Sequence, residues 1–371
     1  MSETANLLQL VQEQLEDFCE ERRNEFSAIS PDLTTVVDYT QSLLAGGKRF
    51  RALFCYWAWA GTLTVAEPQQ NPEQLAKSSA SMVGIAAALE MFHAAALVHD
   101  DLLDQSDTRR GAPSVHKRFE ALHQKSGWGG SPERFGVAGS VLVGDLMLGW
   151  SSELFGHALL QSPNLIIESA CRDEFSRMRV EVMAGQYLDV LEENAAMTRP
   201  VSEAVGRANR VMLYKTAKYS IEAPLLIGAA FAGAEPGLLR ALSAFGIPLG
   251  MAFQLRDDIL GVFGDPSVTG KPAGDDLREG KRTVLIALTR EALPTSVGKV
   301  VDELLTAKEL DAEQIGFLQR TIVSTQALAK TERMIDELAN ESLAALDLID
   351  MNPSAKQQLR ELALKVINRD S

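Results

Sequence analysis

Clustered aspartates are the residues of this sequence whose spacing most directly suggests chemistry. Asp100, Asp101 and Asp104 follow a long apolar stretch. Residues four apart are neighbours on a helix, so Asp100 and Asp104 would present two carboxylates on one face. Mg²⁺ takes oxygen ligands and is commonly held by one or two carboxylates together with substrate phosphate oxygens. The spacing therefore favours a magnesium site, and the alternative is a solvated acidic end of a helix.

A second acidic cluster follows another apolar stretch, which ends at Asp257 and Asp258. Carboxylates gathered at the rim of an apolar bundle repel one another unless cations lie between them. Divalent cations that bridge to a diphosphate would remove this repulsion, whereas the simpler interpretation is a polar loop that ends a helix. The segment after the pair adds Asp265, Lys271, Asp275 and Asp276.

Basic residues accompany the acidic clusters. Guanidinium and ammonium groups pair with phosphate oxygens. Each basic pair by itself would be interpreted as surface charge, but in an acidic protein, beside two acidic motifs, they indicate a diphosphate site. The basic residues are Lys48, Arg49 and Arg51 after the Gly46-Gly47 turn, and Arg109 and Arg110 after the first acidic cluster.

The charge balance excludes one class of partner. The 371 residues carry 36 Lys and Arg against 50 Asp and Glu, a formal net charge of −14. Proteins that bind nucleic acid usually have a clustered positive field, so no nucleic-acid partner is expected. A composition of 46% hydrophobic and 23% charged residues is typical of a globular protein with a sizeable core.

Several features bear on location. Cys19, Cys55 and Cys171 show no CxxC spacing, so neither a disulfide framework nor a zinc site is expected, and a reducing cytoplasm fits best. The N-terminal segment lacks the basic start and apolar stretch of a signal peptide. The longest uninterrupted weakly polar or apolar run, 223–234, holds twelve residues, fewer than the roughly 20 that span a bilayer. We expect no export and no integral membrane segment.

Hydrophobic residues recur with a helical period along most of the chain, as at Leu239, Leu242 and Phe245, while period-2 alternation is scarce. The pattern predicts an all-α protein, a large bundle of twelve or more helices. No linker or repeat divides the chain, so a single domain over 1–371 is expected. Stretches rich in helix-forming residues cover 81–103, 137–159, 165–193, 204–219 and 310–348.

Taken together, these residues make the sequence resemble the trans-isoprenyl diphosphate synthases, the polyprenyl synthetase family that includes farnesyl and geranylgeranyl diphosphate synthases. The resemblance implies an all-α bundle around a deep central cavity, usually in a homodimer. The motifs that carry it, in family order, are GGKRFR at 46–51, HDDLLDQSDTRRG at 99–111, GDLML at 144–148, GQYLD at 185–189, KTAKY at 215–219, FQLRDD at 253–258 and GKRT at 280–283.

The resemblance also implies metal ligands. Asp100, Asp101 and Asp104 match the first aspartate-rich motif, with Asp100 and Asp104 as the direct Mg²⁺ ligands. Asp257 leads the second motif, and Asp258 would support its ion through water. Three Mg²⁺ ions per active site, with the allylic diphosphate between them, are the expectation.

Further roles follow from the family pattern. His93 lies seven residues, about two turns, before Asp100 and so on the same helical face. The expected ligands of the allylic diphosphate are Arg109, Lys215 and Lys271, and those of isopentenyl diphosphate are Lys48, Arg51, His93 and Arg110. The expected catalytic residues beside the reacting carbon are Lys215, Thr216 and Gln254.

The implied reaction begins with loss of the allylic diphosphate, whose charge Mg²⁺ and cationic side chains stabilise. Oxygens of Thr216 and Gln254 would stabilise the allylic cation, and the isopentenyl double bond would attack it. The departed diphosphate would take the proton. One residue departs from the family pattern, because Gly261 stands where many members carry a third aspartate in the second motif. Glycine cannot support the third ion, but activity is expected to survive because the leading aspartate makes the main contact in the family.

Product length is expected to depend on side chains before Asp100. Ala95 and Ala96 lie one turn before it, and Met91 and Phe92 lie two turns before it. A turn rises about 5.4 Å, close to one isoprene unit, so an open turn above a closed one predicts geranylgeranyl diphosphate, with twenty carbons. Alternatives are that all four are ordinary core residues, and that the product has fifteen carbons, or twenty-five or more.

Two other functions compete. A class I terpene cyclase also begins with an aspartate-rich motif, but its second metal motif is an Asn/Ser/Glu pattern, where this chain has Asp257 and Asp258. The residues expected to bind isopentenyl diphosphate would be idle in a cyclase. A non-catalytic regulatory subunit of a synthase would be expected to lose aspartates or basic donors, and Gly261 is the one departure found. The sequence therefore favours an active synthase.

Overall fold

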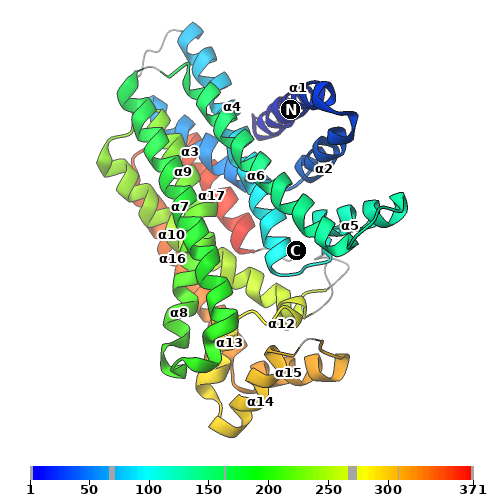
Figure 1. Ribbon diagram of the computed structural model, residues 1–371. Coiled ribbons are helices and arrows are strands. Elements are labelled where there is room, and N and C mark those ends of the chain that lie inside the picture. Colours follow the sequence, from blue (N-terminus) through cyan, green and yellow to red (C-terminus); the bar gives the residue numbers. More distant parts are fainter. Residues whose placement is uncertain (1–2, 67–71, 163, 266–273, 308, 369–371) are drawn as a thin grey trace. The chain divides into compact units, whose positions relative to one another are not determined.

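The computed structural model describes residues 3–66, 72–162, 164–265, 274–307 and 309–368. Almost all of these residues are helical, which confirms the predicted all-α class (Figure 1). The α-helices are α1 (Glu3–Ile29), α2 (Thr34–Leu44), α3 (Phe50–Ala66), α4 (Pro72–Leu103), α5 (Val115–Ser126), α6 (Pro132–Leu159), α7 (Leu165–Ala195), α8 (Ala204–Val211), α9 (Ala223–Phe231), α10 (Pro236–Phe263), α12 (Asp275–Arg278), α13 (Val284–Ala292), α14 (Thr295–Leu305), α15 (Ala312–Ser324), α16 (Ala327–Leu348) and α17 (Pro353–Ile367). Shorter elements are the 3-10 helices η1 (Pro31–Leu33), η2 (Ala196–Thr198) and η3 (Val201–Glu203), the π-helix η4 (Met212–Glu222), and the strands β1 (Thr108–Arg109) and β2 (Ala112–Pro113).

The chain divides into two compact units, which are described separately. Unit 1 comprises Met1–Cys171 and Ile227–Ala234, and unit 2 comprises Arg172–Leu226 and Glu235–Ser371. The first acidic cluster therefore belongs to unit 1 and the second to unit 2. The single domain over 1–371 stays a prediction.

Helix α4 forms the core of unit 1, where it packs against α6, α3 and α1. Its apolar stretch is interrupted by Glu90, which is buried. The Glu90 carboxylate accepts a hydrogen bond from the backbone N–H of Ala52, at 3.2 Å, and lies 3.6 Å from the guanidinium of Arg49. Arg49, which the sequence groups with the phosphate-binding residues, is thus buried in the core, and Glu90 connects the start of α3 to α4.

Three helices among the described residues are long and apolar enough to cross a membrane by length and composition: Glu73–Leu103, Pro132–Leu159 and Pro236–Phe263. Isolated polar residues interrupt the apolar sequence of these helices, as Glu90 and His93 do in the first, so they do not stand out as long uninterrupted runs. The apolar window of the first helix is 83% buried inside the protein. The apolar surface of this helix is therefore covered by other parts of the protein.

The π-helix η4 lies in close contact with two neighbouring helices of unit 2. An ideal Cβ on Gly185 of α7 would lie 2.3 Å from the backbone nitrogen of Lys215, and one on Gly250 of α10 would lie 2.5 Å from the Cα of Ala217. Only glycine permits backbones to approach so closely. The predicted helix over 204–219 is therefore two elements, α8 and η4, and π-helical winding of this kind often occurs at functional sites.

Two other sequence expectations can be compared with the structure. The helix-forming stretch 310–348 contains two helices, α15 and α16, separated at Gln326, whose φ of 61° is left-handed. The sequence predicts no disulfide framework, and Cys19, Cys55 and Cys171 are free thiols, all three of them buried.

Candidate active site

The C-terminal end of α4 carries a group of charged residues in unit 1, called the first polar cluster below. His93 and Asp100 lie on one face of α4 because they are seven residues apart. Asp104, the first residue after α4, continues that face, since its N–H donates to the Asp100 carbonyl at 2.8 Å. All three are partly exposed, whereas Met91 and Ala95, on the opposite face of the helix, are buried. The first polar cluster consists of Lys48, Arg51, His93, Asp100, Asp101, Asp104, Arg109 and Arg110.

A tight hairpin places Arg109 against α4. β1 pairs with β2 in antiparallel fashion, and both residues of the turn, Arg110 and Gly111, have positive φ, as a two-residue type I′ hairpin requires. Arg109 Nε donates to Asp101 Oδ1 at 2.8 Å, and Arg109 Nη2 lies 3.4 Å from Asp100 Oδ2. Asp101 is only 1% exposed, so the structure gives it the task of holding Arg109. The part of Asp101 in the predicted magnesium site, where Asp100 and Asp104 are the expected direct ligands, stays a prediction.

The other arginine of the turn, Arg110, reaches the loop that carries the first basic motif. Its Nη1 donates to the backbone carbonyl of Leu43 at 3.3 Å. An ideal Cβ on Gly47 would lie 3.1 Å from Arg110 Nη2, and Gly47 has a φ of 95°. The glycine therefore leaves space for the guanidinium beside Lys48. The sequence motifs at 46–51 and 99–111 are thus brought together in unit 1.

His93 lies among these cations. Burial lowers its pKa well below the usual range, and the guanidinium groups of Arg51 and Arg110 lower the pKa further, while Asp100 opposes them. The imidazole is therefore neutral at physiological pH and can still donate one N–H. A neutral donor beside several cations is suited to an anion such as a diphosphate.

A line of hydrogen bonds in unit 2 connects residues of η4 and α10. Thr216 Oγ1 donates to Gln254 Oε1 at 2.6 Å, and Gln254 Nε2 donates to Asp258 Oδ1 at 2.7 Å. Lys215 Nζ donates to Asp189 Oδ2 of α7 at 2.5 Å. These contacts fix the orientation of the Thr216 and Gln254 oxygens. The second polar cluster consists of Asp189, Lys215, Thr216, Gln254, Asp257, Asp258, Asp276 and Lys281.

Asp258 is the buried end of this line, with 4% of its surface exposed. Burial raises its pKa well above the usual range, and the neighbouring Asp276 raises it further, whereas the hydrogen bond from Gln254 and the charge of Lys281 lower it. Lys281 Nζ lies 3.6 Å from Asp276 Oδ1 and 2.7 Å from Glu279 Oε2. Asp258 therefore orients the side-chain amide of Gln254 by accepting its hydrogen bond. Lys281 offsets part of the negative charge of Asp276 and Glu279.

Gly261, the position of the missing third aspartate, is covered by another carboxylate. An ideal Cβ on Gly261 would lie 2.0 Å from Asp276 Oδ2 and 2.3 Å from its Cγ. Asp276 belongs to α12, fifteen positions later in the sequence. The space that a side chain at position 261 would need is thus filled by Asp276, which adds a third carboxylate to the pair Asp257 and Asp258.

Comparison with known proteins places these clusters in a family. The sequence profile of the polyprenyl synthetase family matches residues 31–322, which include both clusters. The chain belongs to the polyprenyl synthetase family. The geranylgeranyl diphosphate synthase of Sulfolobus acidocaldarius is 30% identical over 342 residues, covering 92% of this chain and 91% of the relative. The geranylfarnesyl diphosphate synthase of Aeropyrum pernix is 33% identical over 264 residues, covering 71% and 72%.

Solved structures of polyprenyl synthetases agree with this assignment. A crystal structure of geranylgeranyl pyrophosphate synthase from Corynebacterium glutamicum, complexed with isoprenyl diphosphate and magnesium, superimposes with a TM-score of 0.89. Its sequence is 37% identical, and the match covers 98% of both chains. The all-α fold is therefore that of an isoprenyl diphosphate synthase.

Three members of the second polar cluster were not predicted as site residues from the sequence: Asp189, Asp276 and Lys281. Asp189 and Lys281 lie in the family motifs at 185–189 and 280–283, which were the available signals. Asp276 had no such signal beyond its place in an acidic segment. Lys271, predicted for the allylic diphosphate, lies outside the described residues.

The residues predicted to limit chain length separate into two groups on α4. Phe92 and Ala96 are eight and four residues before Asp100 and share its row on the helix. Met91 is nine residues, about two and a half turns, before Asp100 and faces the opposite way. Ala96 is partly exposed, whereas Ala95, Met91 and Phe92 are buried. Phe92 is thus the large side chain on the same row of α4 as Asp100, two turns before it.

The donor set fits the magnesium of this family. Among the described residues, no group of three or more His, Cys, Asp or Glu side chains is arranged to hold a metal ion. Mg²⁺ commonly takes only one or two carboxylates and completes its shell with water and phosphate oxygens. Asp100 and Asp104, four residues apart, supply that number on one face of α4. The cluster thus fits an ion that binds together with a diphosphate.

Proposed function

We propose that the protein condenses isopentenyl diphosphate head-to-tail with allylic diphosphates of five, ten and fifteen carbons, with geranylgeranyl diphosphate as the main product. The observation that carries the proposal is the first polar cluster, in which Asp100 and Asp104 share a helical face with His93 while the hairpin holds Arg109 against Asp100 and Asp101. Membership in the polyprenyl synthetase family supports the transfer of a prenyl group. The relatives named geranylgeranyl diphosphate synthase support the product.

The proposal also covers the domain organisation, oligomeric state, cellular location and metal content of the active enzyme. Each chain is one isoprenoid synthase domain, two chains form a homodimer, and the enzyme acts in the cytoplasm with three Mg²⁺ ions per active site. These points rest on the family resemblance. The magnesium in the crystal structure from Corynebacterium glutamicum supports the choice of metal.

In the proposed site, carboxylates bind Mg²⁺, and the diphosphates are bound by basic side chains and His93. When bound, Mg²⁺ neutralises the diphosphate and makes it a better leaving group. Asp100, Asp104 and Asp257 are the proposed direct ligands, and Asp101 and Asp258 position their neighbours. The proposed ligands of the allylic diphosphate are Arg109, Lys215 and Lys271, and those of isopentenyl diphosphate are Lys48, Arg51, His93 and Arg110.

Two oxygens stabilise the carbon that becomes positive. The Thr216 hydroxyl donates a hydrogen bond to Gln254 Oε1, so the lone pairs of Thr216 Oγ1 remain available. The amide oxygen of Gln254 has a second lone pair for the same purpose. Fixed dipoles of this kind stabilise charge without reorganising during the reaction. The departed diphosphate then takes the proton released on bond formation.

The direct test is an incubation of the purified chain with Mg²⁺, isopentenyl diphosphate and, separately, each of the three allylic diphosphates. Mass spectrometry of the products is expected to give mainly the C20 diphosphate. A different dominant length would overturn the product assignment alone. Absence of condensation from every primer would instead favour a non-catalytic regulatory subunit.

Product length provides a first mutational prediction. Phe92→Ala is expected to shift the main product to twenty-five or more carbons, because Phe92 lies on the row of Asp100 and its removal opens one more turn of α4. Met91→Ala removes a buried side chain of similar size from the opposite face and is the matched control, expected to keep the C20 product. Equal lengthening in both variants would contradict the role of the Asp100 row.

Asp258 provides a second prediction, as a positioning residue. Asp258→Asn keeps an oxygen that accepts from Gln254 Nε2, whereas Asp258→Leu leaves that partly buried N–H without its acceptor. A lost buried hydrogen bond corresponds to about 10- to 100-fold in rate, so kcat is expected to fall by that factor in the Leu variant and much less in the Asn variant. The KM for isopentenyl diphosphate is expected to be unchanged in both. An equal loss of kcat would refute the hydrogen-bonding role.

A further inference from the structure

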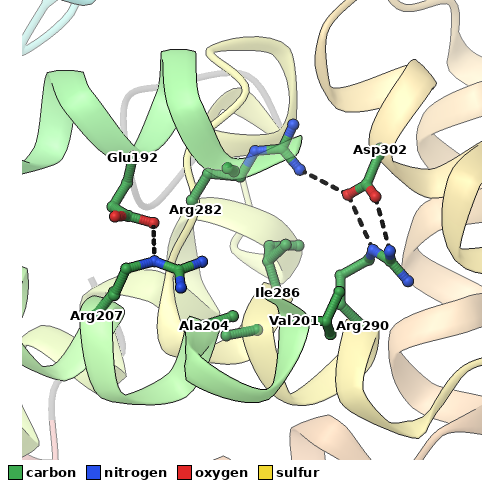
Figure 2. Close-up of a pocket in the computed structure, with 10 residues that line it drawn as sticks. Glu192, Val201, Ala204, Arg207, Arg282, Ile286, Arg290 and Asp302 are labelled. Atoms are coloured by element: carbon green, nitrogen blue, oxygen red, sulfur yellow. Dashed lines mark hydrogen bonds and ion pairs between the residues drawn. The ribbon is translucent and has the colours of Figure 1, made fainter. Parts of the chain in front are cut away.

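A small cavity lies within unit 2, among α7, η3, α8, α13 and α14, and encloses about 40 Å³. Figure 2 shows the pair Glu192–Arg207 on one side of it, the pair Asp302–Arg290 on the other, and Arg282 between them. Apolar side chains, including Ile286, line the rest. None of these residues belongs to either polar cluster, so the cavity needs its own explanation.

Both carboxylates of the cavity, Glu192 and Asp302, accept hydrogen bonds from arginines through each of their oxygen atoms. Glu192 Oε2 accepts from Arg207 Nε at 2.8 Å, and Glu192 Oε1 accepts from Arg199 Nη1 at 2.7 Å. Asp302 Oδ1 accepts from Arg290 Nε at 2.9 Å, and Asp302 Oδ2 accepts from Arg290 Nη2 at 2.7 Å. Each of the four carboxylate oxygens therefore already accepts a hydrogen bond from Arg199, Arg207 or Arg290.

Arg282 has a hydrogen-bond acceptor for only one of its three nitrogen atoms among the described residues. Its Nη1 shares Asp302 Oδ1, at 3.1 Å. Its Nε and Nη2 are buried and have no hydrogen-bond partner in the part of the chain that the structure describes. The side chain is 7% exposed, and burial, followed by the charge of Arg290, lowers its pKa despite the opposing effect of Asp302. A buried guanidinium with two unsatisfied N–H groups is costly unless an acceptor is present.

The local charge is positive even when the rim is included. Four arginines, Arg199, Arg207, Arg282 and Arg290, face Glu192, Asp302 and the largely exposed Glu203, which lies 3.5 Å from Arg207. Four positive charges against three negative ones leave an excess of one. Water could accept from the N–H groups of Arg282 but would not neutralise that charge.

The unsatisfied atoms also have the right geometry for an oxyanion. Nε and Nη2 form one edge of a guanidinium, with two parallel N–H groups that bind carboxylate or phosphate oxygens in bidentate fashion. Arg290 uses the same edge to bind Asp302. A single water needs about 10–15 Å³ of such space, so a cavity of about 40 Å³ has room for a group of several oxygen atoms.

We propose that this cavity binds a small tetrahedral oxyanion of the phosphate class, held by the Nε–Nη2 edge of Arg282 and by the positive charge of Arg207. The site is separate from the proposed prenyl transfer and does not depend on it. Inorganic phosphate and the terminal group of inorganic diphosphate share the required chemistry, and the two are distinguished by testing each ion.

The test compares the full chain with Arg282→Met. This variant is expected to fold, because Asp302 keeps both contacts with Arg290 when Arg282 is removed. Arg320→Met, which replaces an exposed arginine of α15 in the same unit, is the matched control. Crystals soaked in tungstate, a tetrahedral oxyanion with an anomalous signal, are expected to show a peak beside Arg282 in the full chain and the control, and none in Arg282→Met. A peak that survives Arg282→Met, or a cavity with water alone, would overturn the proposal.

A solution measurement separates this site from the first polar cluster, which also attracts anions. Phosphate and diphosphate are titrated in EDTA at constant ionic strength, in a Lys48→Met, Arg51→Met background, with binding measured by calorimetry. The phosphate Kd is expected to rise at least about tenfold on adding Arg282→Met, the loss of a charged bidentate contact, and to be unchanged on adding Arg320→Met. Binding of diphosphate alone would identify the longer ion as the ligand. Equal affinity in all variants would refute the site.

Discussion

Asp100→Asn is expected to reduce kcat by about 10²- to 10³-fold, the size of effect seen when one preorganised group that stabilises developing charge is removed. Asp100 and Asp104 are the two carboxylates that share the partly exposed helical face at the C-terminal end of α4. The amide keeps the shape of the side chain and removes its charge, so Asp104 is the one carboxylate left of the pair, and the binding of Mg²⁺ together with a diphosphate is weakened. Steady-state kinetics at saturating Mg²⁺ measures the loss.

The same variant has an effect that does not depend on turnover. Mg²⁺ together with inorganic diphosphate is expected to raise the Tm of the unaltered chain and to leave the Tm of Asp100→Asn unchanged. Without ligands, Asp100→Asn is not expected to lower the Tm, because it reduces repulsion with Asp101 and Asp104. Asp107→Asn is the matched control, since Asp107 is exposed and pairs with Lys117 at 3.3 Å. Wild-type activity in Asp100→Asn would refute the metal-binding role.

Much of the first polar cluster could be predicted from the sequence because its residues are close along the chain or follow helical spacing. Asp100 and Asp104 share a face by the four-residue rule, and His93 joins them two turns away. The role of Asp101 could not be predicted in the same way. It depends on the hairpin turn at Arg110 and Gly111, which directs Arg109 back to α4.

Tertiary contacts limited the prediction elsewhere. Arg49 lies between two phosphate-binding candidates in sequence, and only the fold reveals that it pairs with the buried Glu90. The helical period predicts a helix at 204–219 but not its change to π-helical winding at Met212, which accompanies the close contacts of Gly185 and Gly250. Each error arises because a local pattern does not specify which distant backbone will approach.

Gly261→Asp, which restores the third aspartate found in many family members, is expected to damage the enzyme. The Cβ alone would lie 2.0 Å from Asp276 Oδ2, so the Asp276 carboxylate must leave its place beside Lys281. Overpacking of this kind typically costs about 1–3 kcal/mol, and a fourth carboxylate near Asp257 and Asp258 adds repulsion. The Tm is expected to fall, and kcat is expected to fall by at least about tenfold, because the disturbed charges lie next to Asp258 and its partner Gln254.

Three variants separate crowding from charge at this position. Gly261→Ala introduces the Cβ without the carboxylate and is expected to lower the Tm with a smaller loss of kcat. Gly261→Asp combined with Asp276→Gly moves the carboxylate from α12 to α10 and is expected to recover most of both losses, since the number of carboxylates and the filled volume are restored. If Gly261→Asp alone were as active and stable as the unaltered chain, Asp276 would not occupy the place of the missing aspartate. Recovery in the double variant would show that the α10 and α12 positions compete for one space, which the Asp276 carboxylate fills in this chain.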